Sequence, residues 1–529
     1  MGGGLPLLIL IGAWLFSISV YAYLGAHNLD SDQSSEMVLA QLLNEEGQLL
    51  SKNWHYSTEL RVLSPVPIYQ LALLLFDSWH MARTFSIAVL LLGIALSLIY
   101  LLRSIGMKDA VYYAAACLVL PVSWGNTFIL IYGQFYSVYF MVLCLLLGLF
   151  FRIKNGTMRR AKIIGLLLLS VWSGMQGVRM LMLCAAPLML VMMLLFVMRV
   201  ASCKTIREAV AVLREIRAPH AMLIVVGTVA GYLVNQQFFS KVYAFSSFSD
   251  TQFIGMDWNQ LSKQINMIPE YLGFADGVQL ISISGVTNAV ALLIAFASLI
   301  NLYDMFKHQE KFSDEMRLMI GFTAISVIIG IAFNCMTDFG VTHERNSISY
   351  YLPGVMFMIT LAFARIEKVY SRSGRIRTLL LLTVCVMFGM CSVQYIRSGM
   401  KSNDADYEVR AQDLLDLGYT TGFATFWNAN VLTEASDGVI DVYTYNTWGD
   451  RYMYSWLQKK EHFDHPHKGK VFVLIDTVEA ATQNPPLAKE EHLLCETYNG
   501  WIYVYDSAQE VMDIQYNENT GIRENSLSE

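Results

Sequence analysis

Long apolar runs alternate with short polar segments over the first 400 residues of the chain. Most of these runs have the length, roughly 17 to 25 residues, at which an α-helix crosses the hydrocarbon core of a bilayer. The pattern predicts a polytopic α-helical membrane protein with about 11 transmembrane helices. They are expected near 5–25, 83–102, 111–131, 135–151, 163–177, 178–198, 220–239, 279–303, 318–336, 348–366 and 378–396.

A shorter apolar run, Val62 to Phe76, contains Pro65 and Pro67. Proline removes a backbone donor and disfavours a helix interior, so we interpret this run as an interfacial or re-entrant piece of a long loop, 26–82. A twelfth span here would invert the sidedness of everything after it. The first apolar run has no Lys or Arg before it, and we expect an uncleaved anchor there rather than a signal peptide.

Basic residues are unequally divided between alternate loops. Up to Lys401, twenty Lys and Arg fall in one set of loops and nine in the other. Cytoplasmic loops carry the excess of positive charge, which predicts a cytoplasmic N-terminus. The loops 26–82, 240–278 and 337–347 and the whole C-terminal tail are then expected on one outer face.

Composition separates a membrane domain, 1–401, from a tail, 402–529. The whole chain is 55% hydrophobic and 15% charged, whereas the last 129 residues hold 9 Lys/Arg and 22 Asp/Glu. Alternating helical and strand-like stretches predict an outer-face α/β domain for the tail, with strands at Gly422 to Trp427, Lys470 to Ile475 and Gly500 to Tyr505. Basic patches with interleaved aromatics are absent from the sequence, which excludes a nucleic-acid binder.

Metal and disulfide chemistry have little support. Six of the eight cysteines lie inside apolar runs, where they serve as small core residues. His462, Asp464, His465 and His467 have a spacing that can bind a transition metal, but Pro466 and the surrounding charges favour a solvated loop.

Three carboxylates follow the first predicted span, namely Asp30, Asp32 and Glu36. At the water-facing end of a transmembrane helix they can deprotonate a hydroxyl or hold a divalent cation. Alternatively, Asp30 and Asp32 only cap the helix expected from about Ser34 to Asn44. Later in the same loop, aromatic and charged residues suit a sugar site, although an interfacial aromatic belt explains the aromatics as well. These residues are Trp54, Tyr56, Glu59 and Arg61.

Two further basic positions lie at predicted outer ends of spans. Arg345, between His343 and Tyr350, can bind a lipid phosphate or simply extend to the interface. Arg179 lies between two spans without a loop of its own; it is either a phosphate contact or a cap at the membrane surface.

This order of elements resembles the GT-C class of integral-membrane glycosyltransferases, in the branch of protein O-mannosyltransferases and the aminoarabinose transferase. The resemblance implies a polyprenyl-phosphate sugar donor, an acceptor that is a glycan, lipid or protein, and a loop-one carboxylate as general base. By position that base is Asp32 or Asp30; Gln33 stands where the family usually has Glu. Glu59 corresponds to the second acidic residue of the family's first loop, and Arg345 with Tyr350 resembles its Arg-Tyr-x-x-Pro element.

The resemblance predicts a transferase of the cell envelope in a bacterial plasma membrane, with membrane lipid around it. No cofactor is required in this branch, although a divalent cation is possible. The alternative hypothesis is a non-enzymatic translocator or export partner for polysaccharide or lipid-linked glycan. Transporters place ionisable or Gly/Pro-broken helices at the midplane of related halves, whereas here the charges gather at one rim. A weaker alternative is a glycan polymerase or ligase.

Overall fold

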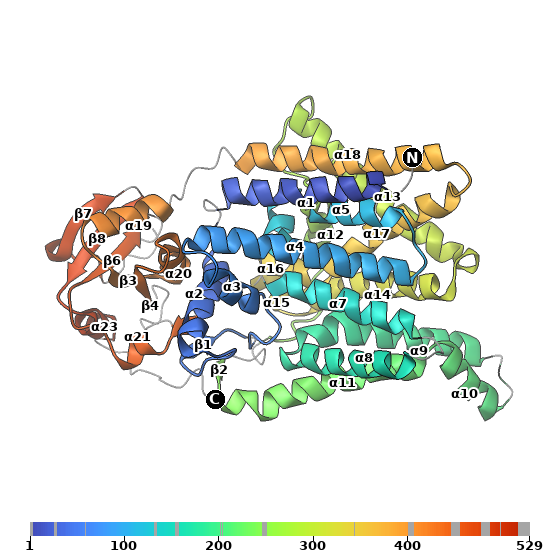
Figure 1. Cartoon of the computed structure of the whole chain (residues 1–529), viewed down its shortest axis with the longest axis horizontal. Helices are drawn as coiled ribbons and strands as arrows, with labels where there is room; N and C mark the ends of the chain where they lie inside the picture. Colours follow the sequence, from blue (N-terminus) through green and yellow to red (C-terminus); the bar gives the residue numbers. More distant parts are fainter. Residues whose placement is uncertain are drawn as a thin grey trace.

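A computed structural model of the chain describes residues 4–25, 29–58, 60–131, 135–153, 158–201, 203, 205–245, 251–342, 344–399, 407–445, 455–477, 487–497 and 499–516. Within these ranges the molecule has two parts, a bundle of long helices and a smaller domain with a β-sheet at one end of the bundle (Figure 1). We refer to this end as the domain side.

Every predicted apolar run coincides with helical structure. Among the described residues, seven helices are long and apolar enough to cross a membrane. They are α1 (Gly4–Leu24), α4 (Trp79–Ser104), η3 (Leu181–Ala185) continued by α9 (Ala186–Val200), α11 (Ala218–Gln237), α13 (Ile283–Lys307), α14 (Asp314–Met336) and α18 (Gly374–Gly399). An eighth span arises if α5 (Ala110–Val119) is joined to the segment Trp124–Leu130 across a 101° bend; that segment comprises α6 (Trp124–Asn126) and most of η2 (Thr127–Ile131).

The count of 11 spans is therefore not confirmed, although the helical membrane fold is. The other three predicted runs form α7 (Phe135–Arg152), α8 (Arg159–Met175) and α17 (Leu352–Val369), which do not meet the same criteria of length and composition. Helix α17 is buried from Leu352 to Leu361. A helix that is apolar on all sides belongs inside a bundle, and α17 forms its centre.

The long loop between α1 and α4 folds against the domain side of the bundle (Figure 1). It contains α2 (Ser31–Glu46), β1 (Trp54–Tyr56) and α3 (Val66–Leu73). With eight residues, α3 is about 12 Å long, less than half of the hydrocarbon thickness of about 30 Å. It agrees with the predicted interfacial piece and is too short for a twelfth span.

Helix α2 has a defined cap at each end. Asp30 adopts an extended conformation and its side chain accepts a hydrogen bond from the backbone N–H of Asp32, as an N-cap residue does. Gly47 ends the helix with φ of 65°, a left-handed conformation that glycine adopts without steric cost.

The C-terminal domain is built on a five-stranded mixed sheet with the order β4-β3-β6-β8-β7. β3 runs parallel to β4 and β6, and β8 runs antiparallel to β6 and β7. Strands β3, β6 and β8 lie where the sequence predicted strands. The bounds are β3 (Thr421–Thr425), β4 (Asp441–Tyr445), β6 (Val471–Asp476), β7 (Leu493–Thr497) and β8 (Gly500–Tyr505).

Helices cover both faces of this sheet. On one face, α19 (Tyr407–Asp416) and α20 (Phe426–Ala435) pack against Ala424, Val442 and Phe472. On the other, α23 (Ala508–Tyr516) packs against alternate residues of the same strands, including Val471 and Val473. This arrangement confirms the predicted α/β character of the tail, while the boundary between residues 401 and 402 stays a prediction.

A second, three-stranded sheet joins segments that are far apart in the sequence. Its order is β2-β1-β5, with β2 (Ala244–Phe245) from the loop after α11 and β5 (Gln458–Lys459) from the C-terminal domain. An isolated bridge between Phe253 and Thr337 connects that loop to the segment of α15 (Phe339–Thr342) and α16 (Glu344–Ser347). The segments predicted to share one face therefore meet on the domain side; which compartment this is remains a prediction.

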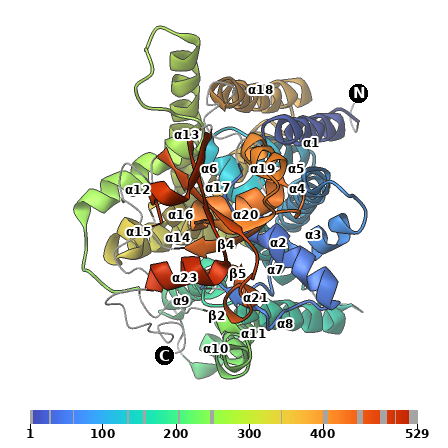
Figure 2. The same cartoon turned by 90° about the vertical axis from the view of Figure 1, so that its left-hand side faces the viewer.

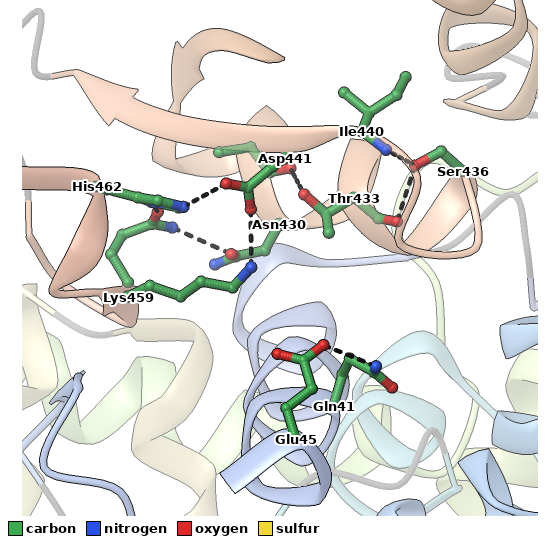
Figure 3. Close-up of polar contacts among 11 residues, drawn as sticks. Gln41, Glu45, Asn430, Thr433, Ser436, Ile440, Asp441, Lys459 and His462 are labelled. Carbon is green, nitrogen blue, oxygen red and sulfur yellow. Dashed lines mark hydrogen bonds and ion pairs between the residues drawn. The ribbon is translucent and has the colours of Figure 1, made fainter. Parts of the chain in front are cut away.

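A partly buried polar network ties β5 to the large sheet. Figure 3 shows Asp441 between His462 of α21 (Glu461–Asp464) and Lys459, with α2 below them. Asp441 accepts from Lys459 Nζ at 2.9 Å and contacts His462 Nε2 at 2.9 Å. Burial alone would raise the pKa of Asp441, but His462 and Lys459 outweigh it and hold that pKa well below its usual range. The buried His462 is thus a structural residue of this network, and among the described residues no cluster of three His, Cys, Asp or Glu could hold a metal ion.

His55 gives a test of the three-stranded sheet. Its ring lies edge-on to Phe463 at 5.8 Å between ring centroids, and burial, aided by the nearby Lys460, lowers its pKa from 6.5 to about 4 despite the opposing effect of Asp464. The unfolded chain then binds more protons than the folded chain between these values, so stability falls as the pH drops from about 6.5 toward 4.

We expect the thermal unfolding midpoint of the full chain in detergent to fall over this pH window. The fall should be shallower in His55→Gln, which does not titrate. His465→Gln, at an exposed position of the C-terminal domain, should behave as wild type. Equal pH slopes for His55→Gln and wild type would contradict the half-buried, neutral state of His55.

Candidate functional site

The acidic segment after α1 lies at the start of α2, on the domain side. Asp30 is the N-cap, with its Oδ1 3.0 Å from the N of Asp32. Asp32 is half-buried in the first helical turn. Glu36, one turn further, is buried and lies 3.5 Å from Nε of Arg61, which is also buried. The structure therefore brings Glu36 and Arg61 together beside the two aspartates.

Arg83 of α4 holds this segment from the membrane side. Its Nη2 donates to the carbonyl of Gln33 at 3.0 Å and its Nη1 to the hydroxyl of Tyr69 at 3.3 Å. The same guanidinium forms an ion pair with Glu434 of α20, with Nη2 2.7 Å from Oε2 and a second bond from Nε to Oε1. Arg83 and Glu434 are both buried, so they form a charge-assisted bidentate contact out of water.

Further contacts attach the C-terminal domain to the same place. The hydroxyl of Ser31 donates to the carbonyl of Phe426, and the N–H of Trp79 donates to Oδ1 of Asp437 at 2.6 Å. Gly438 lies against the Trp79 ring, where a Cβ would come within 2.5 Å of it. The domain thus packs directly on the segment that carries the aspartates.

The aromatic residues of the loop do not form an exposed surface of the kind that binds a sugar. Trp54 and Tyr56 are buried, and the Tyr56 hydroxyl accepts a hydrogen bond from the N–H of Ser51. Both rings pack under α2 with Leu60 and Tyr69. Neither offers a face to a sugar in this conformation, and their burial favours a packing role. Glu59 lies outside the described residues.

Arg179 occupies a buried aromatic site. It lies between α8 and η3, is 3% exposed, and donates from Nη1 to Oγ of Ser349 at 2.8 Å. Its guanidinium carbon lies over three tyrosine rings. The distances to the ring centroids are 4.5 Å for Tyr350, 4.9 Å for Tyr136 and 5.7 Å for Tyr139. Arg179 and Tyr350, both singled out in the sequence, are therefore brought together.

A small cavity adjoins this arginine site. Tyr136, Tyr139, Ser349 and Pro353 line it, together with apolar residues of η2 and α17. His343 lies outside the described residues. Arg345 belongs to α16, and its side chain lies outside what the structure describes.

The acidic segment and the arginine site are connected through a buried contact. The N–H of Leu63, two residues after Arg61, donates to Oε1 of Gln176 at 2.8 Å. Gln176 is buried and stands three residues before Arg179. The first loop is thus fixed against the same helix end that presents the arginine.

The site holds groups suited to two kinds of chemistry. A carboxylate such as that of Asp32 can accept a proton from a hydroxyl, and an arginine guanidinium can bind a phosphate. In this structure Arg179 is covered by Ser349 and the tyrosine rings, so a phosphate reaches it only when these contacts open. Asp30 is less suited to the proton transfer because its carboxylate caps α2.

The fold has counterparts among solved structures. The apo structure of ArnT from Cupriavidus metallidurans has a TM-score of 0.54 and 9% sequence identity, over 92% of this chain and 96% of that chain. ArnT bound to undecaprenyl phosphate also has a TM-score of 0.54, with 10% identity over 94% and 97% of the two chains. The apo oligosaccharyltransferase of Archaeoglobus fulgidus is less similar, at a TM-score of 0.49 and 11% identity over 90% and 70%.

No protein-family model matches the chain, and no curated protein matches its sequence. The similarity to ArnT nevertheless extends over nearly the full length of both chains. The protein therefore has a fold similar to that of ArnT, which confirms the predicted resemblance at the level of the fold.

Sequence reasoning missed Arg83 and Glu434. A signal for Arg83 was present, because a charged residue at the edge of an apolar run marks a contact that must compensate it. Glu434 carried no such signal, since an acidic residue in an acidic domain is ordinary. Its contact with Arg83 depends on how the domain docks.

Glu434→Gln removes a charge from the buried pair and leaves Arg83 uncompensated. Breaking one partner of such a pair costs about 3–5 kcal/mol, so we expect a clear fall in the thermal unfolding midpoint in detergent. Glu408→Gln, an exposed position on α19, is the matched control and should stay near wild type.

The double variant Glu434→Gln/Arg83→Gln separates the ion pair from other causes. It should be less destabilised than the sum of the two single variants, since neither charge is then left alone. Additive effects would show that the two charges do not interact across this interface.

Proposed function

We propose that the protein is an integral-membrane glycosyltransferase that moves a sugar from a polyprenyl-phosphate donor to an acceptor on the outer face of a bacterial plasma membrane. The observation that carries the proposal is the buried Arg179 site, held against a loop that bears carboxylates. The fold supports it, and ArnT has been solved bound to undecaprenyl phosphate.

In the proposed reaction the carboxylate of Asp32 takes the proton of an acceptor hydroxyl. The hydroxyl oxygen forms a bond to the anomeric carbon of the sugar, and the bond between that carbon and the phosphate oxygen breaks. The polyprenyl phosphate leaves with the bonding electrons, and its negative charge is stabilised by Arg179. Such stabilisation is effective in a water-excluded site, where the donors are already oriented.

The structure favours Asp32 over Asp30 as the base. The Asp30 carboxylate accepts the N–H of Asp32 and fixes the start of α2. Its removal should weaken the helix, while removal of the Asp32 carboxylate leaves that cap in place. Glu36 and Arg61 are then positioning residues, since they are buried together behind the first turn.

The division of roles predicts different outcomes for two matched variants. With purified protein in lipid and a panel of polyprenyl-phosphate sugars, Asp32→Asn should lose transfer by a factor of 10² or more, the size typical of a general base. Its unfolding midpoint should remain near that of wild type.

Asp30→Asn should retain measurable transfer, because Asn is also a good N-cap residue. Transfer is expected to persist in excess EDTA. Full transfer by Asp32→Asn would move the base elsewhere, and a wild type that moves a lipid-linked glycan across a bilayer without bond formation would favour the translocator.

Arg179→Lys tests the phosphate site. Lysine keeps the charge but not the planar set of donors, so the contacts to a phosphate and to the three tyrosine rings should weaken. We expect kcat/KM for the lipid donor to fall at least about tenfold, the effect of losing one charge-assisted hydrogen bond. Arg199→Lys, in an exposed pair with Glu215, should leave it unchanged. An unaltered kcat/KM in Arg179→Lys would remove Arg179 from the donor site.

A further inference from the structure

A large apolar groove lies on the bundle outside the arginine site. It has a volume of about 600 Å³ and lies between α1, α5, α13 and α18. Small residues from three of these helices open it, among them Gly12, Ala116 and Gly389. A Cβ at Gly12 or Gly389 would meet nothing within 4 Å. The groove is therefore open space between the helices that side chains do not fill.

The groove has the length of one bilayer leaflet. On α18 it extends from Cys385 to Arg397, and the rise along the helix between these two residues is about 18 Å. Half of the hydrocarbon core is about 15 Å. Since α18 ends at Gly399, shortly before α19, the Arg397 end is on the domain side and the Cys385 end lies near the middle of the membrane.

One charge stands at the water-facing end of this apolar surface. Arg397 is exposed, and it has no ion pair or hydrogen bond among the described residues. A cation in the last turn of a helix is favoured by the helix dipole. The dipole explains the position of the charge but not the apolar groove that begins beneath it.

We propose that this groove binds a phospholipid with an anionic headgroup from the leaflet on the domain side. The acyl chains lie against exposed apolar residues of α18 such as Val386 and Val393, and the phosphate contacts Arg397. An arginine near a membrane surface attracts anionic lipid by about fivefold in affinity. The proposal does not depend on transferase activity.

The groove is separate from the site assigned to the sugar donor. In Figures 1 and 2, α18 lies at one flank of the bundle, and none of the residues that line the groove is among those that contact Arg179. A groove that ends near the bilayer middle also suits an acyl chain of leaflet length. A long polyprenyl chain would have to leave it.

Native mass spectrometry of the full-length protein in detergent tests the proposal. The protein is titrated with palmitoyl-oleoyl phosphatidylglycerol or with phosphatidylcholine that has the same acyl chains. Wild type should bind phosphatidylglycerol about fivefold more tightly. Arg397→Gln should reduce this preference to near parity. Arg375→Gln, an exposed arginine at the other end of α18, is the matched control and should keep it.

Gly389→Leu tests the groove itself, because a Cβ at this position meets nothing within 4 Å and a leucine side chain would occupy part of the groove. Binding of both lipids should fall while the unfolding midpoint is kept. Three results would overturn the proposal: equal binding of the two lipids by wild type, an unchanged preference in Arg397→Gln, or displacement of phosphatidylglycerol by equimolar undecaprenyl phosphate. The last would make the groove a polyprenyl-phosphate site.

Discussion

The ion pair of Arg83 with Glu434 is the interaction on which the rest of the domain side depends. Removing two charges from water is costly, and the cost is recovered only when every donor finds a partner. Here the guanidinium also binds the Gln33 carbonyl and the Tyr69 hydroxyl. A domain docked in another register would leave a buried charge without compensation, so the pair specifies one arrangement of membrane helix, loop and domain.

That arrangement places two kinds of chemistry on one rigid support. The first turn of α2 is held by Arg83 from the bundle and by the Phe426 carbonyl from the domain. Arg179 is held by Ser349 and by three tyrosine rings, next to the buried helix α17. The hydrogen bond from Leu63 to Gln176 connects the loop that bears the carboxylates to the helix end that bears the arginine.

Much of the fold could be predicted from the sequence because membrane insertion demands long apolar runs and a sheet demands alternation. The helices, the α/β tail and the shared side of the loops all follow from such local patterns. The site was less predictable. The sequence left Asp30 as either a helix cap or a base, and only its hydrogen bond identifies the cap. Trp54, predicted as part of a sugar-binding surface, is buried. The role of Glu434 comes from its contact with Arg83, 351 residues earlier in the chain, and no local sequence pattern predicts such a contact.

The three-stranded sheet β2-β1-β5 has a consequence for how the protein is made. Its first strand precedes its last by some 400 residues, and Ser31 meets Phe426 across a separation of 395 residues. Chains are synthesised from the N-terminus, so the first loop emerges on the membrane surface long before its partners exist. The acidic segment is thus completed only when the last domain folds onto it, and an unfinished chain in the membrane carries its carboxylates without the frame that positions them.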